Sequence, residues 1–169
     1  MVCPRARKSE YAALPCRRGR RSSRRSQSSP GECGGFDAGR HKTIATLRAD
    51  GSPRISGVEC EFTDGDLRFG SVAGARKGAD LKRDPRFALH GPTFHPEEGK
   101  ENDWPGEAKV AGRAILGGPV FSDGTNEQDG DVFTADITEV VITGLDATAT
   151  RLVVESWTPE RGLRRVERE

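Results

Sequence analysis

The chain has 169 residues, of which 31% are charged and 6% are aromatic, and this length is typical of one domain. No apolar run approaches the roughly 20 residues of a membrane-spanning helix, so no membrane segment is predicted. The four cysteines lack the C-x-x-C spacing of zinc sites, and only Cys60 lies beyond the first 40 residues, which argues against a metal site and a disulfide framework. We therefore predict a protein of a reducing compartment, the cytoplasm.

The first 40 residues differ in charge from the rest of the chain. Residues 1–40 contain ten Lys and Arg against three Asp and Glu, whereas residues 41–169 contain 17 against 23. A stretch such as RRGRRSSRR has no apolar periodicity and does not bury enough surface to offset the entropy of ordering. We therefore predict a disordered Arg/Ser-rich tail at 1–40 and a folded domain at 41–169.

Three interpretations of this tail stay open. Basic runs bind phosphate groups without sequence preference, so the tail could be an arm for nucleic acid or another polyanion. Its Arg and Ser content with few acids is also typical of an organelle-targeting peptide. The third interpretation is a segment without a role that results from a misassigned start site or a shifted reading frame. We favour the third, and we do not expect binding to nucleic acid or to a membrane.

Short runs of β-branched and apolar residues, separated by turn signals, predict an antiparallel β structure. The runs KTIATL and PRISGVECEF flank an Asp-Gly turn at Gly51, and a second Asp-Gly pair within Thr63–Asp66 precedes a strand at Leu67–Val72. A short helix follows and ends before Pro85, because the residue that precedes a proline avoids the helical region.

Further strands are predicted at Arg86–Gly91, Ala108–Leu116, Val132–Leu145 and Arg151–Trp157, with Leu163–Glu169 as a candidate extension. Polar loops connect them, including GTNEQDGD at 124–131. Six or seven strands with one short helix suit a small antiparallel barrel. The spacing alone also leaves a sandwich open.

The short helix starts with two adjacent cations, Arg76 and Lys77. A helix start already exposes unpaired N–H groups and a positive partial charge, so a cation in the first turn costs about 0.3–1 kcal/mol. One interpretation is that both side chains point into solvent and this cost is tolerated. The other is that a bound anion such as phosphate meets the N–H groups and both cations, while Gly70 and Gly74 let the backbone approach it closely.

Four segments of the domain, in this order, resemble the pyridoxamine 5′-phosphate oxidase-like family of FMN-binding split barrels. They are TLRADGSPRISGVE (46–59), ARKGADLKRDPRFAL (75–89), GEAKVAGRA (106–114) and RLVVESWTPERGLRRVER (151–168). The resemblance covers about residues 41–169, and the Arg-rich tail stands where the family has an N-terminal helix. It implies a mainly β fold, a six- to seven-stranded antiparallel split β-barrel with one or two short helices. It also implies bound FMN and a homodimer with cofactor sites at the subunit interface.

The resemblance implies cofactor-binding roles for several residues of the first half of the domain. Arg76 and Lys77 match the family's Arg-Lys pair that holds the flavin phosphate, although Ala75 stands where the family often has a serine. Ser71 matches a strand-end hydroxyl that contacts the cofactor. Arg54 matches a basic residue of the second strand that lies near the phosphate or the ring.

The last hairpin carries three further matches. Trp157 corresponds to a cofactor-side tryptophan. With one extra residue in the turn, Arg164 corresponds to an arginine used for the substrate and Arg168 to one used for the cofactor. Glu59 and Val166 replace a lysine and a substrate-side histidine of the true oxidases, and these departures argue against vitamin B6 chemistry.

These residues also have purely structural interpretations. Trp157 suits a core position, Arg54 a surface position after a turn, and Ser71 a helix cap or a strand end. The arginines of the last hairpin suit pairing with neighbouring glutamates on a solvated face. Cys60 suits a small apolar strand residue better than a nucleophile.

The sequence contains no convincing acid–base pair or nucleophile, and a flavin enzyme needs none, because the ring performs the hydride chemistry. We therefore expect a flavin-binding oxidoreductase that transfers hydride or electrons to or from a small molecule through bound FMN, with no catalytic side chain and no metal. Two alternatives stay open: a reductase that uses the deazaflavin coenzyme, which also carries phosphate, and a non-catalytic cofactor-binding module. A polyanion-binding protein that acts through the basic tail is the least favoured interpretation.

Overall fold

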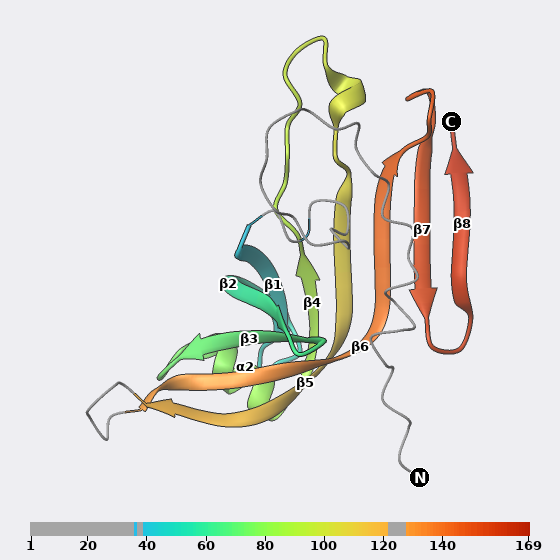
Figure 1. The fold of residues 1–169 in the computed structure, drawn as a ribbon. Helices are drawn as coiled ribbons and strands as arrows, with labels where there is room; N and C mark the ends of the chain where they lie inside the picture. Colours follow the sequence, from blue (N-terminus) through green and yellow to red (C-terminus); the bar gives the residue numbers. More distant parts are fainter. Residues whose placement is uncertain (1–35, 37–38, 122–127) are drawn as a thin grey trace.

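The computed structural model describes residues 36, 39–121 and 128–169, which form a mainly β structure with one α-helix (Figure 1). In chain order the elements are β1 (His41–Leu47), β2 (Pro53–Thr63), β3 (Asp66–Val72), α2 (Arg76–Arg83), β4 (Arg86–His90), the 3₁₀ helix η2 (Glu101–Asp103), β5 (Glu107–Phe121), β6 (Gln128–Leu145), β7 (Leu152–Thr158) and β8 (Gly162–Arg168). The disorder predicted for the tail concerns residues that lie, apart from 36, 39 and 40, outside the described ones. No helix of the described part is long and apolar enough to cross a membrane.

The strands form one antiparallel sheet in the order β3-β2-β1-β4-β5-β6-β7-β8, and β3 also pairs with β6. This additional pairing closes β1 to β6 into a six-stranded barrel, and β7 and β8 extend it as a hairpin (Figure 1). The predicted antiparallel barrel is therefore confirmed, and the sandwich is excluded. The described strands number eight rather than six or seven, because the last residues of the chain form β8 as a complete strand.

The strand β6 belongs to both the barrel and the hairpin. Its residues Gly130–Thr134 pair with β3, whereas Val140–Leu145 pair with β7. The start of β6 at Gln128 corrects the prediction of a loop at 124–131, and β5 likewise extends to Phe121, beyond its predicted end. The two strands pair with each other along this polar stretch, so backbone hydrogen bonds to neighbouring strands hold it in place.

Both Asp-Gly pairs form the predicted turns. Asp64 and Gly65 have φ values of 53° and 92°, the left-handed backbone that a two-residue hairpin loop requires. In the first turn Gly51 has a φ of 82°, and the Asp50 carboxylate accepts a hydrogen bond from the Ser52 N–H at 2.9 Å. These local preferences set the positions of β1, β2 and β3.

Alternate residues of the barrel strands point into one aromatic and aliphatic core. The Phe69 ring meets the Phe87 ring edge-on at 5.3 Å between centroids and stacks on the Phe133 ring at 5.8 Å. Phe36 and Trp157 belong to the same core and are 2% and 6% exposed. Phe36 lies before residue 41, the predicted start of the domain. The core therefore includes a residue that was predicted to belong to the tail.

The helix α2 packs against β1 and β3 at one end of the barrel. Leu81 anchors it in the core, and Gly78 lies so close to β3 that a β-carbon there would be 2.6 Å from Ser71 Oγ. The helix ends as predicted, since Asp84, which precedes Pro85, has an extended backbone with φ −131° and ψ 105°. These contacts fix where the start of α2, with its two cations, lies on the barrel.

Candidate functional site

The start of α2 presents backbone N–H groups that no described side chain caps. The N-cap residue is Ala75, with φ −66° and ψ 137°, and the first turn contains no acidic residue. The first hydrogen bond within the helix runs from the Ala79 N–H to Ala75 O at 3.2 Å, so the N–H groups of residues 76–78 lack an acceptor inside the helix. This helix start therefore offers donors and a positive partial charge to an anion.

Arg76 and Lys77 both lie in this first turn, but their contacts differ. Lys77 Nζ donates to Gly57 O at 2.7 Å and thereby joins α2 to β2. Arg76 is exposed, and its guanidinium makes no hydrogen bond or ion pair with any other described residue. The interpretation in which both cations point into solvent therefore fits Arg76 only.

Arg54 reaches a buried carboxylate on α2. Its Nε donates to Asp80 Oδ2 at 2.6 Å, and the side chains of Arg54 and Asp80 are 17% and 4% exposed. Thr46 Oγ1 donates to the same oxygen at 3.0 Å, and Arg83 Nη2 donates to Asp80 Oδ1 at 3.1 Å. We call Thr46, Arg54, Asp80 and Arg83 the Asp80 cluster. Arg54 is therefore not a plain surface residue, because it joins β2 to the helix.

The contacts of the Asp80 cluster control the ionisation of its carboxyl group. Burial raises the pKa of Asp80. The hydrogen bonds from Arg54, Arg83 and Thr46 together lower this pKa by more than burial raises it, so the pKa lies below its ordinary value. Asp80 is thus an anion at neutral pH and balances one neighbouring guanidinium charge. It was not predicted from the sequence, although it is the single acid of the helix RKGADLKR, among four cations.

Ser71 lies inside the barrel beneath α2. It is buried near the end of β3, with Oγ facing Gly78, which fits the strand-end interpretation. Next to it on β6, the Asp131 carboxylate accepts hydrogen bonds from Lys82 Nζ at 2.7 Å and from Gln128 Nε2 at 3.1 Å. This second buried carboxylate joins α2 to β6. It was not predicted from the sequence, because residues 124–131 have the composition of a polar loop.

The register of the last hairpin separates the residues predicted there. Trp157 lies opposite Leu163, and Arg164 lies opposite Ser156. Opposite residues share a face and successive residues alternate, so Arg164 and Arg168 lie on one face of the hairpin and Trp157 on the other. Trp157 packs into the core, as its structural interpretation predicts, whereas the two arginines are exposed.

Arg165 is the hairpin arginine that shares the face of Trp157. It donates to Glu155 at 3.4 Å and to Glu167 at 2.9 Å. The pairing of hairpin arginines with neighbouring glutamates is therefore confirmed for Arg165. The resemblance to the family, which allows one extra residue in the turn, pointed to Arg164 and Arg168 and not to Arg165.

The hairpin and the helix α2 contact β6 near opposite ends of the strand. The helix contacts β6 at Asp131, and the hairpin pairs with Val140–Leu145. About nine strand residues lie between the two places, which corresponds to roughly 30 Å measured along the strand. Figure 1 shows β7 and β8 on the far side of the molecule from α2. One chain therefore does not bring the exposed hairpin arginines next to the cations of the helix start.

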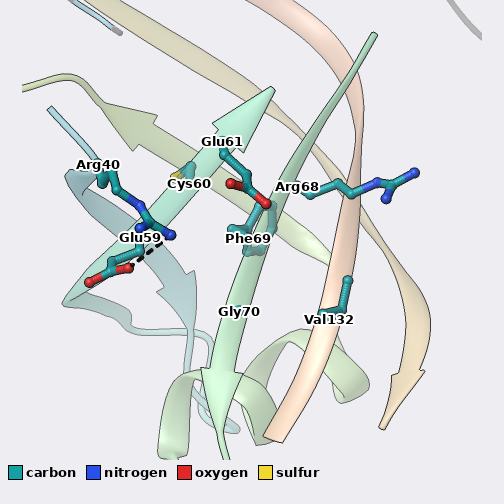
Figure 2. A pocket seen from close by; sticks show the side chains of 8 residues that line it. All are labelled: Arg40, Glu59, Cys60, Glu61, Arg68, Phe69, Gly70 and Val132. Atoms are coloured by element: carbon teal, nitrogen blue, oxygen red, sulfur yellow. Dashed lines mark ion pairs between the residues drawn. The ribbon is translucent and has the colours of Figure 1, made fainter. Parts of the chain in front are cut away.

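An open cavity of about 310 Å³ lies against β2, β3 and β6 (Figure 2). Its lining residues are Arg40, Glu59, Cys60, Glu61, Arg68, Phe69, Gly70 and Val132. None of the predicted cofactor-binding residues lines it. Glu59, which replaces the lysine of the true oxidases, pairs with Arg40 at 3.6 Å, the dashed contact in Figure 2.

Cys60 has the structural role that its sequence context suggests. The side chain is buried in the core, and this burial raises the pKa of its thiol to about 11. The thiol is thus protonated at neutral pH and is a poor nucleophile. Within the described ranges, no three His, Cys, Asp or Glu residues form a group that could hold a metal ion.

Solved structures of other proteins share this architecture. No protein-family model and no curated protein matches the chain. A pyridoxamine 5′-phosphate oxidase-related, FMN-binding protein from Nostoc punctiforme is similar, with a TM-score of 0.55 and 11% identity over 77% of this chain and 87% of that chain. PhzG from Burkholderia lata, in complex with tetrahydrophenazine-1-carboxylic acid, is similar with a TM-score of 0.54 and 8% identity over 77% of this chain and 82% of that chain.

These similarities define the class of fold. The chain has the split-barrel fold of pyridoxamine 5′-phosphate oxidase-related proteins, as the resemblance of its sequence predicts. At 11% and 8% identity the likeness establishes the fold and no activity.

Proposed function

We propose that the chain is a divergent flavin-binding protein of the pyridoxamine 5′-phosphate oxidase-like family, and that the start of α2 binds the flavin phosphate. The observation that carries the proposal is the uncapped helix start, with two cations and no acid in its first turn. Helix starts of this kind bind phosphate through their N–H groups and the helix dipole. FMN is the first candidate cofactor, because the structural neighbour from Nostoc punctiforme is FMN-binding.

The residues of the first turn fit a phosphate group in kind and in charge. The Arg76 guanidinium has its donors available to a ligand, and Lys77, held against Gly57 O, adds a second positive charge. Ala75 supplies no hydroxyl, so this contact of the family is missing. Ser71 is buried, and it would act by supporting the helix from below.

A bound flavin ring would supply the hydride chemistry, and the chain would hold and orient it. On this basis we propose oxidoreductase activity on a small molecule. The deazaflavin coenzyme also carries phosphate and would be accepted at the same helix start. The absorption spectrum of the protein purified from its native host distinguishes the two cofactors, and reoxidation of the reduced flavin by a substrate distinguishes an enzyme from a binding module.

We also propose that the functional form is a homodimer. The exposed hairpin arginines and the helix start can serve one ligand only if they come from two subunits, since β6 separates them within a chain. Large apolar side chains are exposed on β2 and β3, with Ile55 75% and Val72 71% exposed, and contact with a second copy would remove them from water. In this arrangement Arg168 contacts the cofactor and Arg164 the substrate.

Titration of the purified protein with FMN, followed by quenching of the flavin fluorescence, tests the phosphate site. Arg76→Ala/Lys77→Ala should weaken binding by at least about a hundredfold, because two charge-assisted contacts are lost. Lys100→Ala/Arg113→Ala removes the same charge from exposed positions outside α2 and should bind FMN like the unmodified protein. Equal affinities of the two double variants would overturn the proposal.

A further inference from the structure

We infer that Asp80 is a positioning residue of the phosphate site and that it keeps Arg54 out of contact with the ligand. The inference rests on the proposed function of the α2 start. The resemblance implies that Arg54 lies near the phosphate or the ring. The geometry instead assigns Arg54 an indirect role, through the balance of charge beneath the helix.

The contacts of Arg54 hold its side chain against the underside of α2. Its Nε is engaged by Asp80 at 2.6 Å, and the side chain is mostly buried. Thr46 lies directly opposite Arg54 in the β1–β2 pairing and donates to the same carboxylate oxygen. One side chain from β1 and one from β2 therefore donate hydrogen bonds to the same oxygen of Asp80. Arg54 Nε is therefore directed to an oxygen that lies midway along the helix, beyond its first turn.

The other oxygen of Asp80 holds the last turn of the helix. Arg83 Nη2 donates to this oxygen at 3.1 Å and also to Leu47 O at the end of β1. Lys77 makes the corresponding connection from the first turn to Gly57 O on β2. The helix is thus attached to the β1–β2 hairpin near both ends, which fixes the direction in which its first turn faces.

The charge of Asp80 is close enough to act on an anion at the helix start. Arg76 and Asp80 are four residues apart, so they lie on the same side of the helix and roughly 6 Å apart along its axis. While Arg54 pairs with Asp80, their charges cancel, and the anion is attracted by Arg76, Lys77 and the N–H groups. Removal of the Arg54 charge alone leaves Asp80 paired only with Arg83, so the net charge beneath the helix falls by one and attracts the phosphate less. Removal of both the Arg54 and the Asp80 charge leaves Arg83 and restores the original net charge.

Two variants test this inference by titration with FMN. Arg54→Gln should weaken FMN binding by roughly three- to tenfold, because one positive charge is lost about one helical turn from the phosphate. Arg54→Gln/Asp80→Asn keeps the polar shape of the pair without its charges and should bind within roughly twofold of the unmodified protein. Arg54→Gln/Asp129→Asn is the matched control, because Asp129 is exposed and should not restore binding.

A direct contact between Arg54 and the phosphate gives a different result, since the double variant would then bind as weakly as Arg54→Gln. That outcome, or unchanged affinity in Arg54→Gln, overturns the inference. If thermal unfolding shows that Arg54→Gln does not fold, the double variant still decides: matched affinity supports the inference, and a tenfold or larger loss overturns it. The two proposals fail differently. If Arg76→Ala/Lys77→Ala loses FMN binding and Arg54→Gln/Asp80→Asn also binds FMN weakly, the role of Asp80 is refuted and the phosphate site is not. Unchanged binding in Arg76→Ala/Lys77→Ala refutes the phosphate site itself.

Discussion

At the scale of single residues, the contact between α2 and the barrel leaves no room for a β-carbon at Gly78. Such an atom would lie 2.6 Å from Ser71 Oγ and 3.2 Å from Ser71 Cβ. Ser71 is itself buried and packed, so it has little space into which it can move. Packing against β3 therefore requires a residue that is otherwise unfavourable inside a helix.

Gly78→Ala should lower the free energy of unfolding by about 1–3 kcal/mol, because overpacking outweighs the roughly 1 kcal/mol that alanine gains within a helix. Gly144→Ala is the control, since a β-carbon there meets no atom within 4 Å, and its effect should stay within about 0.5 kcal/mol. Urea unfolding at neutral pH measures both variants. Equal stability of Gly78→Ala and the unmodified protein would show that the helix is not packed as closely as described.

The Asp80 cluster should make the stability of the protein depend on pH. Burial raises the pKa of Asp80, but the hydrogen bonds lower it by more, so the folded-state pKa lies below the ordinary 3.8. The stability that this depression contributes is complete above the unfolded pKa and is lost as the pH falls through the folded pKa. Asp80→Asn should therefore be less stable than the unmodified protein at neutral pH, and the difference should shrink below about pH 4.

Urea unfolding between pH 7 and the acid limit of folding measures this difference. Asp129→Asn is the control, since its exposed side chain makes no hydrogen bond within the described part of the chain. The free energy of unfolding of Asp129→Asn should differ little from that of the unmodified protein, and this difference should not shrink as the pH falls. A destabilisation by Asp80→Asn that grows as the pH falls would contradict the assigned direction of the pKa.

At the scale of elements, local preferences of the backbone were predictable and pairing between distant segments was not. Asp-Gly turns and Pro85 determine where β1, β2 and α2 begin or end, because these residues restrict their own dihedral angles. The strand β5 continues through Gly117, Gly118 and Pro119 to Phe121, and β6 begins among polar residues at Gln128, since pairing with neighbouring strands supplies their hydrogen bonds. Arg54 and Asp80 are 26 positions apart, and only the packing of α2 brings them together. The helix start and its cations could thus be predicted, but the carboxylate beneath them could not.

The two faces of the β7–β8 hairpin should respond differently to substitution. Trp157→Ala should lower the free energy of unfolding by about 3–5 kcal/mol, because a large side chain leaves the core. Arg164→Ala/Arg168→Ala should change it by no more than about 0.5 kcal/mol, since both side chains are exposed. Under the proposed function the arginine variant should nevertheless weaken FMN binding by about tenfold.

Urea unfolding and FMN titration on the same preparations separate these effects. Arg161→Ala, in the turn of the same hairpin, is the control for loss of a positive charge and should change neither quantity. Unchanged FMN affinity in Arg164→Ala/Arg168→Ala would remove the hairpin from the proposed site. A stable Trp157→Ala variant would contradict the core position of this residue.

At the scale of the whole molecule, the two elements that carry the proposed cations, α2 and the β7–β8 hairpin, lie near opposite ends of β6, and Figure 1 shows how these elements are arranged. One chain therefore carries the two halves of the proposed site and does not join them. In a two-fold dimer, the surface around α2 of one chain can face the hairpin of the other, and symmetry then creates two equivalent composite sites. This arrangement also accounts for the apolar side chains that one chain leaves exposed on β2 and β3.

Mixing two defective variants tests whether the site is shared between subunits. Arg76→Ala/Lys77→Ala lacks the helix half of every site, and Arg164→Ala/Arg168→Ala lacks the hairpin half. In a mixed dimer, one site combines both intact halves and the other combines both defects. Random co-assembly of equal amounts makes half of the dimers mixed, so about a quarter of all sites should regain the FMN affinity of the unmodified protein. The stoichiometry of tight FMN binding after co-expression measures this fraction. A site contained within one chain would give no recovery, because every chain in the mixture carries a defect.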